Sequence, residues 1–343
     1  MLELDELRLV VVVDNETDTL SSIDNAEQTA ESADLLSRLE PAEVVDGHAR
    51  TTVFDHLCCA CHGFSLLLTG LLNGEERSVL FDVGPYPEVW LANAERLGLD
   101  LSTIETVFLS HWHWDHSGGL AEVLPAIVAA RKAAGLEPPV LNLHPDRPEV
   151  RGIRIPDDRV LLLPAEPTID HLAATGAHVS LQGEAHDIAG GFFVGSGEIP
   201  RVTEFETGLH GHVNRRPGGA FADDPLILDE RFLAATVAGR GTSVFSACSH
   251  AGIVNATTAA VDLTGAPLDL VLGGYHLAGK TMEERIPATV AALEALTPAL
   301  IAPGHCTGWR AKAALADAFA PTKRFAPSVV GTRYTLQSNA EPM

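Results

Sequence analysis

The chain has 343 residues, of which 46% are hydrophobic, so it is long enough for one large domain or two ordinary ones with a sizeable core. Its formal net charge of −23 repels the phosphates of nucleic acids and the surface of anionic membranes, so we expect neither as a partner. Five cysteines, an odd number, do not resemble a disulfide framework, and a reducing cytoplasm is the simpler expectation.

The start of the chain does not resemble a targeting segment. The first residues, MLELDELRLVVVV, lack the basic region and the small-residue cleavage site of a signal peptide. No apolar run approaches the roughly 20 residues that a membrane-spanning helix needs. We therefore expect neither a signal peptide nor a transmembrane helix.

The first third of the chain predicts alternating strands and helices. The β-branched run LRLVVVVDN (7–15) is a strand, and GFSLLLTGLLNGEERSVLFDVG (63–84) is a hairpin around the turn dipeptide Asn-Gly. Between them, residues 16–50 form a polar, acidic insertion with one expected helix, NAEQTAESADLLSRL (25–39). Further helices are expected over 87–98 and 119–134, on either side of a buried strand, IETVFLS (104–110).

That buried strand leads into a dense cluster of potential metal ligands, SHWHWDHSGG (110–119). His111 and His113 are two residues apart, so in an extended segment they point the same way. Asp115 and His116 follow where the chain turns, and the small Ser-Gly-Gly run lets the backbone bend tightly. Imidazole and carboxylate suit zinc, iron or manganese. This one loop can therefore supply two ligands to each of two metal ions, but each ion still needs a distant ligand.

Three later strands each finish with a histidine. TSVFSACSH, LDLVLGGYH and ALIAPGH end at His250, His276 and His305, and each precedes a helical pattern, over 251–262, 281–296 and 309–320. Such alternation predicts layered α/β packing, with the histidines on one edge of the sheet. The alternative to a metal site is a polar surface loop together with ordinary core histidines. It explains a single histidine better than it explains this cluster.

Several motifs together resemble a known family. HWHWDHSGG matches the H-x-H-x-D-H signature of the metallo-β-lactamase superfamily, and VLFDVG matches its aspartate-containing strand end. The stretches VDN, CHGFSLLL, SGEIPRVTEFE, DDPLIL, CSHAGIVN, GGYHLAG and PGHCTGW resemble the branch of the 7,8-dihydropterin-6-methyl-4-(β-D-ribofuranosyl)aminobenzene-5′-phosphate synthases. The resemblance implies an α/β fold, an αββα sandwich, with metals at one edge of the sheets. We expect a single domain over 1–343, with the insertion near 16–50 and a pocket-covering region near 140–240.

The resemblance also implies a ligand set for two divalent transition-metal ions, with zinc favoured over iron or manganese. His111, His113 and His250 would hold one ion, and Asp115, His116 and His305 the other. Many superfamily members carry a bridging aspartate near the strand end that here reads SACSH, with no carboxylate. Cys248 or His250 would then replace it, or a water would bridge.

Other residues are candidates for the pocket or for supporting the ligands. Asp82 in FDVG is placed to orient a ligand histidine, as metal-bound histidines usually require. His62, Glu198 and His276 are expected to line the pocket, each with an ordinary packing or surface role as the alternative. Two groups are expected to lie outside the site: the solvated loop residues His210 and His212, and the buried cysteines Cys58, Cys59 and Cys61.

These features predict a metal-dependent hydrolase. Two ions about 3.5–4 Å apart would generate a metal-bound hydroxide that attacks an ester, amide, lactone or phosphoester, with Asp115 as ligand and proton acceptor. The alternatives are a transferase like the pterin synthase and a di-iron redox protein. The transferase alternative would require two phosphorylated substrates. The acidic chain, with one evident arginine pair in a loop (NRRPGG), is a poor match for them. We expect a small-molecule substrate and leave open a homo-oligomer.

Overall fold

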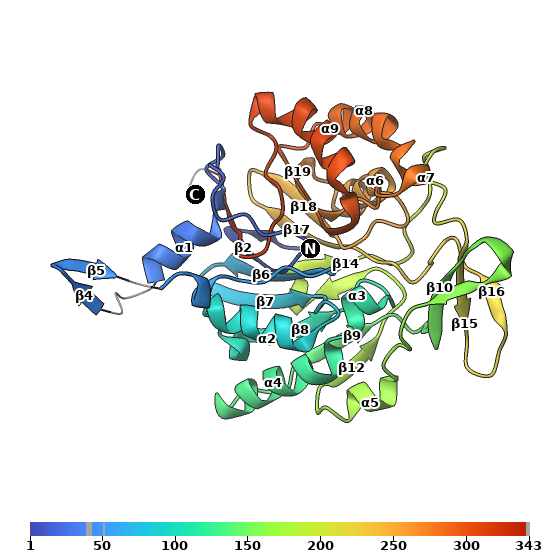
Figure 1. The fold of residues 1–343 in the computed structure, drawn as a ribbon, viewed down its shortest axis with the longest axis horizontal. Helices are drawn as coiled ribbons and strands as arrows, with labels where there is room; N and C mark the ends of the chain where they lie inside the picture. The colour runs from blue at the N-terminus through green and yellow to red at the C-terminus, as the bar shows by residue number, and fades with distance from the viewer. Residues whose placement is uncertain (39–42, 51, 341–343) are drawn as a thin grey trace.

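In the computed structural model, which describes residues 1–38, 43–50 and 52–340, two β-sheets lie face to face and helices cover their outer faces (Figure 1). The first sheet has the strand order β12-β9-β8-β7-β6-β2-β21-β3. Its strands are β2 Glu6–Val13, β3 Gln28–Thr29, β6 Ser65–Leu72, β7 Glu75–Phe81, β8 Ile104–Phe108, β9 Val140–Leu143, β12 His178–Leu181 and β21 Arg333–Gln337. The expected hairpin over 63–84 is confirmed, because β6 and β7 pair antiparallel from Leu72 and Glu75 at the turn.

The second sheet has the order β13-β14-β17-β18-β19-β20, with β1 paired to β17. Its strands are β1 Glu3–Leu4, β13 His186–Ile188, β14 Phe193–Gly195, β17 Leu233–Val237, β18 Gly241–Ser246, β19 Leu268–Gly274 and β20 Leu300–Gly304. The three strands predicted to end in histidines, β18, β19 and β20, are parallel neighbours. Their carboxyl ends therefore lie together at one edge.

Side-chain alternation along the strands creates a core on each face of the first sheet. In β2, Leu7, Leu9 and Val11 belong to the central core between the sheets, whereas Val10 and Val12 belong to the outer core under the helices. The second sheet alternates in the same way, and its own outer core lies under another group of helices. Three buried layers of this kind define the αββα sandwich, so the expected fold is confirmed.

Helices cover each sheet on its outer side. On the first sheet lie α2 Pro87–Arg96, α4 Leu120–Ala133 and α5 Ile169–Ala173. On the second lie α6 Ile253–Thr264, α8 Ile286–Leu296 and α9 Trp309–Phe319. Short helices are α3 Trp114–Ser117 and α7 Lys280–Glu283, and 3-10 turns span Phe54–His56, Leu101–Thr103, Pro156–Asp158, Ala189–Gly191, His305–Thr307 and Ala320–Thr322. No helix in the described ranges combines the length and the apolar character needed to cross a membrane.

Two segments differ from the expected elements. The helix expected over 25–39 is only α1 Glu31–Arg38, because Gln28–Thr29 pairs as β3 with β21; residue 39 lies outside the described residues. The insertion also contains a small hairpin, β4 Glu43–Val45 with β5 His48–Arg50, which projects from the sandwich (Figure 1).

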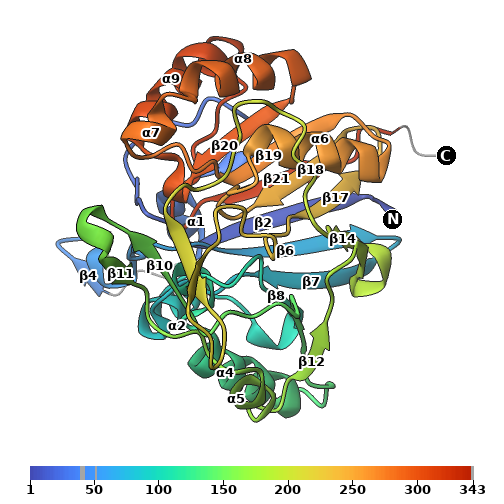
Figure 2. The same ribbon diagram turned by 90° about the vertical axis from the view of Figure 1, so that its right-hand side faces the viewer.

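The segment that contains His212 and NRRPGG, which was expected to be a loop, is instead part of a four-stranded sheet, which we call the roof sheet. Its order is β11-β10-β15-β16, and its strands are β10 Val150–Arg154, β11 Val160–Leu162, β15 His212–Arg215 and β16 Phe221–Asp223. β15 and β16 pair antiparallel across the NRRPGG turn. The roof sheet lies on the side of the sandwich that carries the histidine-bearing strand ends (Figure 2).

Candidate metal centre

The ends of strands from both sheets bring the predicted ligands together. His111 and His113 follow β8, His250 follows β18, and His305 follows β20. Three of these side chains are almost fully buried, and His113 is 6% exposed. Carboxyl ends of parallel strands are where α/β proteins commonly place chemistry, and the topology explains why residues nearly 200 positions apart meet here.

Three imidazoles form the first donor set. His113 Nδ1 lies 2.9 Å from His111 Nε2 and 3.1 Å from His250 Nε2. Two tetrahedral ligand atoms at about 2.1 Å from one ion are about 3.4 Å apart, so these three nitrogens are spaced to share an ion. His250 Nδ1 is buried and has no hydrogen-bond partner in the described residues.

The second donor set combines a carboxylate, two imidazoles and a thiol. Cys248 Sγ lies 3.1 Å from His116 Nε2 and 3.3 Å from His305 Nε2. Asp115 Oδ2 lies 3.5 Å from His116 Nε2 and 3.3 Å from His305 Nε2. Four donor atoms at these separations suit a tetrahedral transition-metal ion, and a thiol favours zinc over calcium or magnesium. Cys248 thus lies at the place where the sequence lacks a bridging carboxylate.

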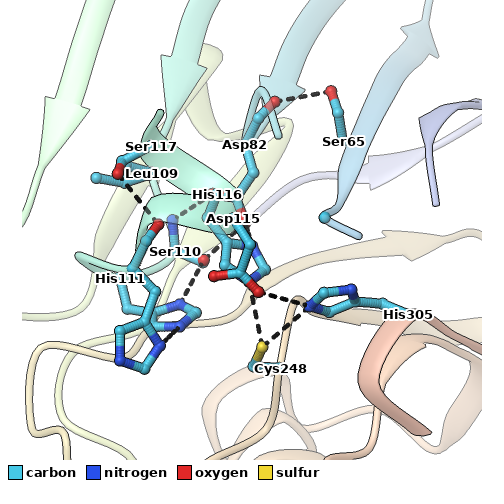
Figure 3. A network of polar contacts seen from close by, with 12 residues as sticks. Ser65, Asp82, Leu109, Ser110, His111, Asp115, His116, Ser117, Cys248 and His305 are labelled. Atoms are coloured by element: carbon cyan, nitrogen blue, oxygen red, sulfur yellow. Dashed lines mark hydrogen bonds and ion pairs between the residues drawn. The ribbon is translucent and has the colours of Figure 1, made fainter. Parts of the chain in front are cut away.

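Asp82 orients candidate ligands of both sets through hydrogen bonds on the side away from the donor atoms (Figure 3). Its Oδ2 accepts a hydrogen bond from His116 Nδ1 at 2.8 Å and another from Ser110 Oγ at 2.7 Å. Ser110 Oγ in turn lies 2.8 Å from His111 Nδ1, so that ring can donate to it. With their Nδ1 atoms engaged in this way, His116 and His111 both present Nε2 to the donor sets. The orienting role expected for Asp82 therefore has a direct geometric basis.

Asn15 orients His305 and His62 in a similar way. It was not among the site residues expected from the sequence. Its Oδ1 lies 2.9 Å from His305 Nδ1, and its Nδ2 donates to His62 Nδ1 at 3.0 Å. These contacts leave His305 Nε2 free for the second donor set and turn His62 Nε2 toward Asp115 Oδ2, at 3.5 Å. The motif VDN, which ends β2, was the available signal.

Burial sets the charge state of the donors. Burial, together with neighbouring histidines, lowers the pKa of His111 and of His113 well below the usual range, so both are neutral, as metal ligands must be. For Asp115, burial acts to raise the pKa, but the neighbouring His116 outweighs it and the pKa lies well below the usual range. The Asp115 carboxylate is therefore ionised.

Other predicted residues separate into those at the site and those outside it. His276 lines the cavity, and its ring centroid lies 4.4 Å from that of His250. His62 lies at the mouth with a 67% exposed side chain. Glu198 is exposed and is not among the cavity-lining residues, so its expected position was wrong.

The expectations for the remaining histidines and cysteines were correct only in part. His210 is exposed, but His212, also expected to be solvated, is 1% exposed and contacts His113. Cys58 is buried as expected, whereas Cys59 is exposed and Cys61 is half-buried. The motif NRRPGG predicted a loop, so His212 was expected to be solvated. The segment is instead a hairpin, and its first strand starts at His212.

Residues of both donor sets line one cavity of about 500 Å³: His113 and His250 of the first set, and Asp115, Cys248 and His305 of the second. Its apolar walls are formed by Pro85, Tyr86, Trp114, Ile153, Leu163, Pro164, Leu209 and Ala278. Four of these, Ile153, Leu163, Pro164 and Leu209, come from the region expected to cover a pocket. Among the described residues, the lining includes no lysine or arginine.

A buried carboxylic acid lies beside the loop 110–119, and its raised pKa predicts how the stability of the protein depends on pH. Glu166 is 3% exposed, hydrogen-bonds with Ser117 Oγ, and burial raises its pKa to about 7. A carboxyl whose folded pKa exceeds its unfolded value of 4.5 destabilises the fold progressively as pH rises from about 4.5 to about 7.

Glu166→Gln should therefore gain stability relative to the parent protein as pH rises. At 1.36 kcal/mol per pKa unit, the difference in unfolding free energy between the two should grow by about 3 kcal/mol from pH 4.5 to pH 8. Urea unfolding of the metal-free proteins at several pH values measures it. The exposed Glu122→Gln serves as the control, and parallel pH profiles for Glu166→Gln and the parent would contradict the expectation.

Comparison with known proteins identifies the relatives of this arrangement. The model of the metallo-β-lactamase superfamily matches residues 62–214, which include the first ligand loop. A curated relative, the 7,8-dihydropterin-6-methyl-4-(β-D-ribofuranosyl)aminobenzene-5′-phosphate synthase of Methanocaldococcus jannaschii, is 29% identical over 257 residues. The aligned region covers 73% of this chain and 82% of the relative.

A solved structure matches over almost the whole chain. Tm1679, described as a metal-dependent hydrolase of the β-lactamase superfamily, superposes with a TM-score of 0.68 at 21% identity, covering 97% of this chain and 100% of that one. At this identity the likeness concerns the fold alone. The resemblance inferred from the motifs, both to the superfamily and to the synthase branch, is confirmed.

Proposed function

Because the chain contains a metallo-β-lactamase superfamily domain, we propose that it is a hydrolase that uses two divalent transition-metal ions to cleave a small molecule. The observation that carries the proposal is the pair of neighbouring donor sets, residues of both of which line one cavity. Imidazoles, of which His111 and His113 are held neutral, an ionised carboxylate and a cysteine are the kinds of donor that such ions require.

The two sets would play different parts. His111, His113 and His250 would hold one ion with three nitrogens, the ligand number typical of catalytic zinc sites, which keep a position for water. Asp115, His116, His305 and Cys248 would hold the other with four donors. When bound, the ions would polarise the substrate carbonyl and lower the pKa of a water molecule toward about 7.

The side chains of the protein then orient the reactants. Asp115 is held as a carboxylate among three imidazoles and lines the cavity, which supports its proposed role as acceptor of the proton of the attacking water. His62 lies at the mouth, and its hydrogen bond with Asp115 raises its pKa. Leu163, just after β11, and Leu209, which precedes β15, would exclude bulk water around the substrate.

The cavity walls favour an uncharged substrate. Tyr86 and Trp114 offer aromatic surface for a ring or an apolar chain, and the lining within the described residues has no lysine or arginine for a phosphate. The net charge of −23 also repels polyanions. We propose a neutral ester, lactone or amide, cleaved when water adds to the carbonyl carbon, the acyl bond breaks and the leaving group takes up a proton.

A substrate panel with metal analysis tests this proposal. Elemental analysis after gentle purification should find about two transition-metal ions per chain. Chromogenic esters, lactones, β-lactams and phosphodiesters, each assayed with zinc, manganese and iron, should reveal turnover of an uncharged class that chelation abolishes and zinc restores. A metal ratio well below one that added ions do not raise would contradict the proposal.

A second candidate is a transferase, and the synthase relative favours it. The name of that relative describes a product with pterin, aminobenzene and phosphate groups. Tyr86 and Trp114 would suit its flat rings, whereas the absence of lysine and arginine from the described lining does not suit its phosphate. No turnover on the panel, together with condensation of a pterin with an aminobenzene riboside phosphate, would decide for the transferase.

A further inference from the structure

We propose that His212, on the roof sheet, is a positioning residue of the metal centre that fixes the orientation and tautomer of His113. This inference rests on the proposed metal centre, because His113 is taken as a ligand of the first donor set. His212 lies 99 residues from His113 in sequence, yet the two Nε2 atoms are 2.9 Å apart. Neither ring is on the surface, with His212 1% and His113 6% exposed.

A backbone carbonyl determines how the protons are arranged. His212 Nδ1 lies 2.7 Å from the carbonyl oxygen of Asp224, which can only accept a hydrogen bond. His212 Nδ1 therefore carries a proton, and in the neutral ring Nε2 is the acceptor. His113 Nε2 must then be the donor of the contact between the rings. It follows that His113 Nδ1 bears the free lone pair, and this is the atom that faces His111 and His250.

The roof sheet and the segment that leads into β17 also contact the loop that carries His111 and His113, at a second point. Arg151, on β10, donates to the carbonyl oxygen of Trp112 at 2.7 Å. Asp229 accepts a hydrogen bond from Trp112 N–H at 2.8 Å and pairs with Arg151. Trp112 lies between His111 and His113 in the chain, so both sides of its backbone are fixed by the region that covers the pocket.

The second donor set is supported in a different way. Its histidines His116 and His305 are oriented by Asp82 and Asn15, which follow β7 and β2 of the sandwich. A change at His212 should therefore weaken the first ion and leave the second unaffected. A histidine that served only for packing would instead lower overall stability without distinguishing the two ions.

The test compares metal binding by three variants of the full-length protein. His212→Phe keeps a ring but removes the acceptor, His212→Gln keeps an acceptor for His113, and His210→Phe is the matched control at an exposed histidine two residues away. Each metal-free protein is titrated with Co²⁺ and followed by visible absorption. Absorption from a cobalt–thiolate pair reports the second set through Cys248, and the remaining ligand-field bands report the first.

We expect His212→Phe to bind the first ion about 10–100-fold more weakly, the usual cost of losing a partner of a ligand histidine. The thiolate signal should be unchanged in that variant. His212→Gln should recover most of the affinity, and His210→Phe should match the parent protein. Circular dichroism of the metal-free proteins checks folding separately. If His212→Phe binds both ions like the parent, or loses both equally while folded, the inference is wrong.

A measurement on the parent protein does not depend on any variant folding. Long-range ¹H–¹⁵N NMR spectra of the zinc-loaded, histidine-labelled protein should show His113 protonated at Nε2 and bound to the ion through Nδ1. Coordination through Nε2 would overturn the inference while leaving the metal centre in place. A parent protein that binds no ion would overturn both the inference and the proposed function.

Discussion

Replacing His113 by alanine should remove the ion of the first donor set and lower the hydrolysis rate by at least about a thousandfold. His113 Nδ1 is the atom that His111 Nε2 and His250 Nε2 both approach, at 2.9 and 3.1 Å. Without it, two imidazoles remain, fewer than the three protein ligands of a catalytic zinc site. Loss of the several kcal/mol that a metal ion contributes to charge stabilisation corresponds to this fall in rate.

Elemental analysis and the substrate panel measure the two effects together. The metal content should fall from about two ions per chain to about one. His276→Ala is the matched control, since His276 lines the same cavity and can approach a metal only together with Cys248 and His250, which the proposal assigns to different ions. If His276→Ala loses as much metal as His113→Ala, then His276 is a ligand and not part of the pocket wall.

Layered α/β packing could be predicted because local patterns and long-range packing agree along the main strands, whereas the order of the layers was implied by the family resemblance. In β2, β6 and β7, alternate apolar residues supply the central core and the outer core, so period-2 alternation survives even in the nearly continuous run LRLVVVV. The helix expected at 25–39 failed at its start because Gln28–Thr29 pairs with β21, more than 300 residues later. Intrinsic helix preference cannot reveal a partner at the far end of the chain.

Local patterns also indicated some of the site residues, whereas others depend on partners far along the chain. His111, His113, Asp115 and His116 are close in sequence, and His250 and His305 end short apolar runs, so spacing and strand position pointed to them. Asn15 and His212 contact the candidate ligands His305 and His113, 290 and 99 residues away, through single hydrogen bonds. No periodic pattern marks such contacts, and only the folded arrangement of the strand ends and the roof sheet reveals them.

Replacing Cys248 by serine should selectively weaken the ion of the second donor set. Cys248 Sγ lies within 3.3 Å of both His116 Nε2 and His305 Nε2, and it is the only soft donor of the four in that set. Loss of a supporting partner alone costs 10–100-fold in metal affinity, so loss of the ligand itself should cost about 100-fold or more for zinc. The cobalt–thiolate absorption of the metal-loaded protein should disappear, while binding at the three histidines of the first set continues.

Cys306→Ser provides the matched control, because it changes a second buried cysteine in the same cavity. Cys306 Sγ donates to the carbonyl oxygen of Cys248 at 3.4 Å, a contact that a serine hydroxyl can replace. This variant should keep the thiolate absorption and both ions. Equal loss of the absorption in the two variants would mean that the cysteines act as a pair. Survival of the absorption in Cys248→Ser would show that another thiol binds the metal, and that the missing carboxylate has been replaced by a residue other than Cys248.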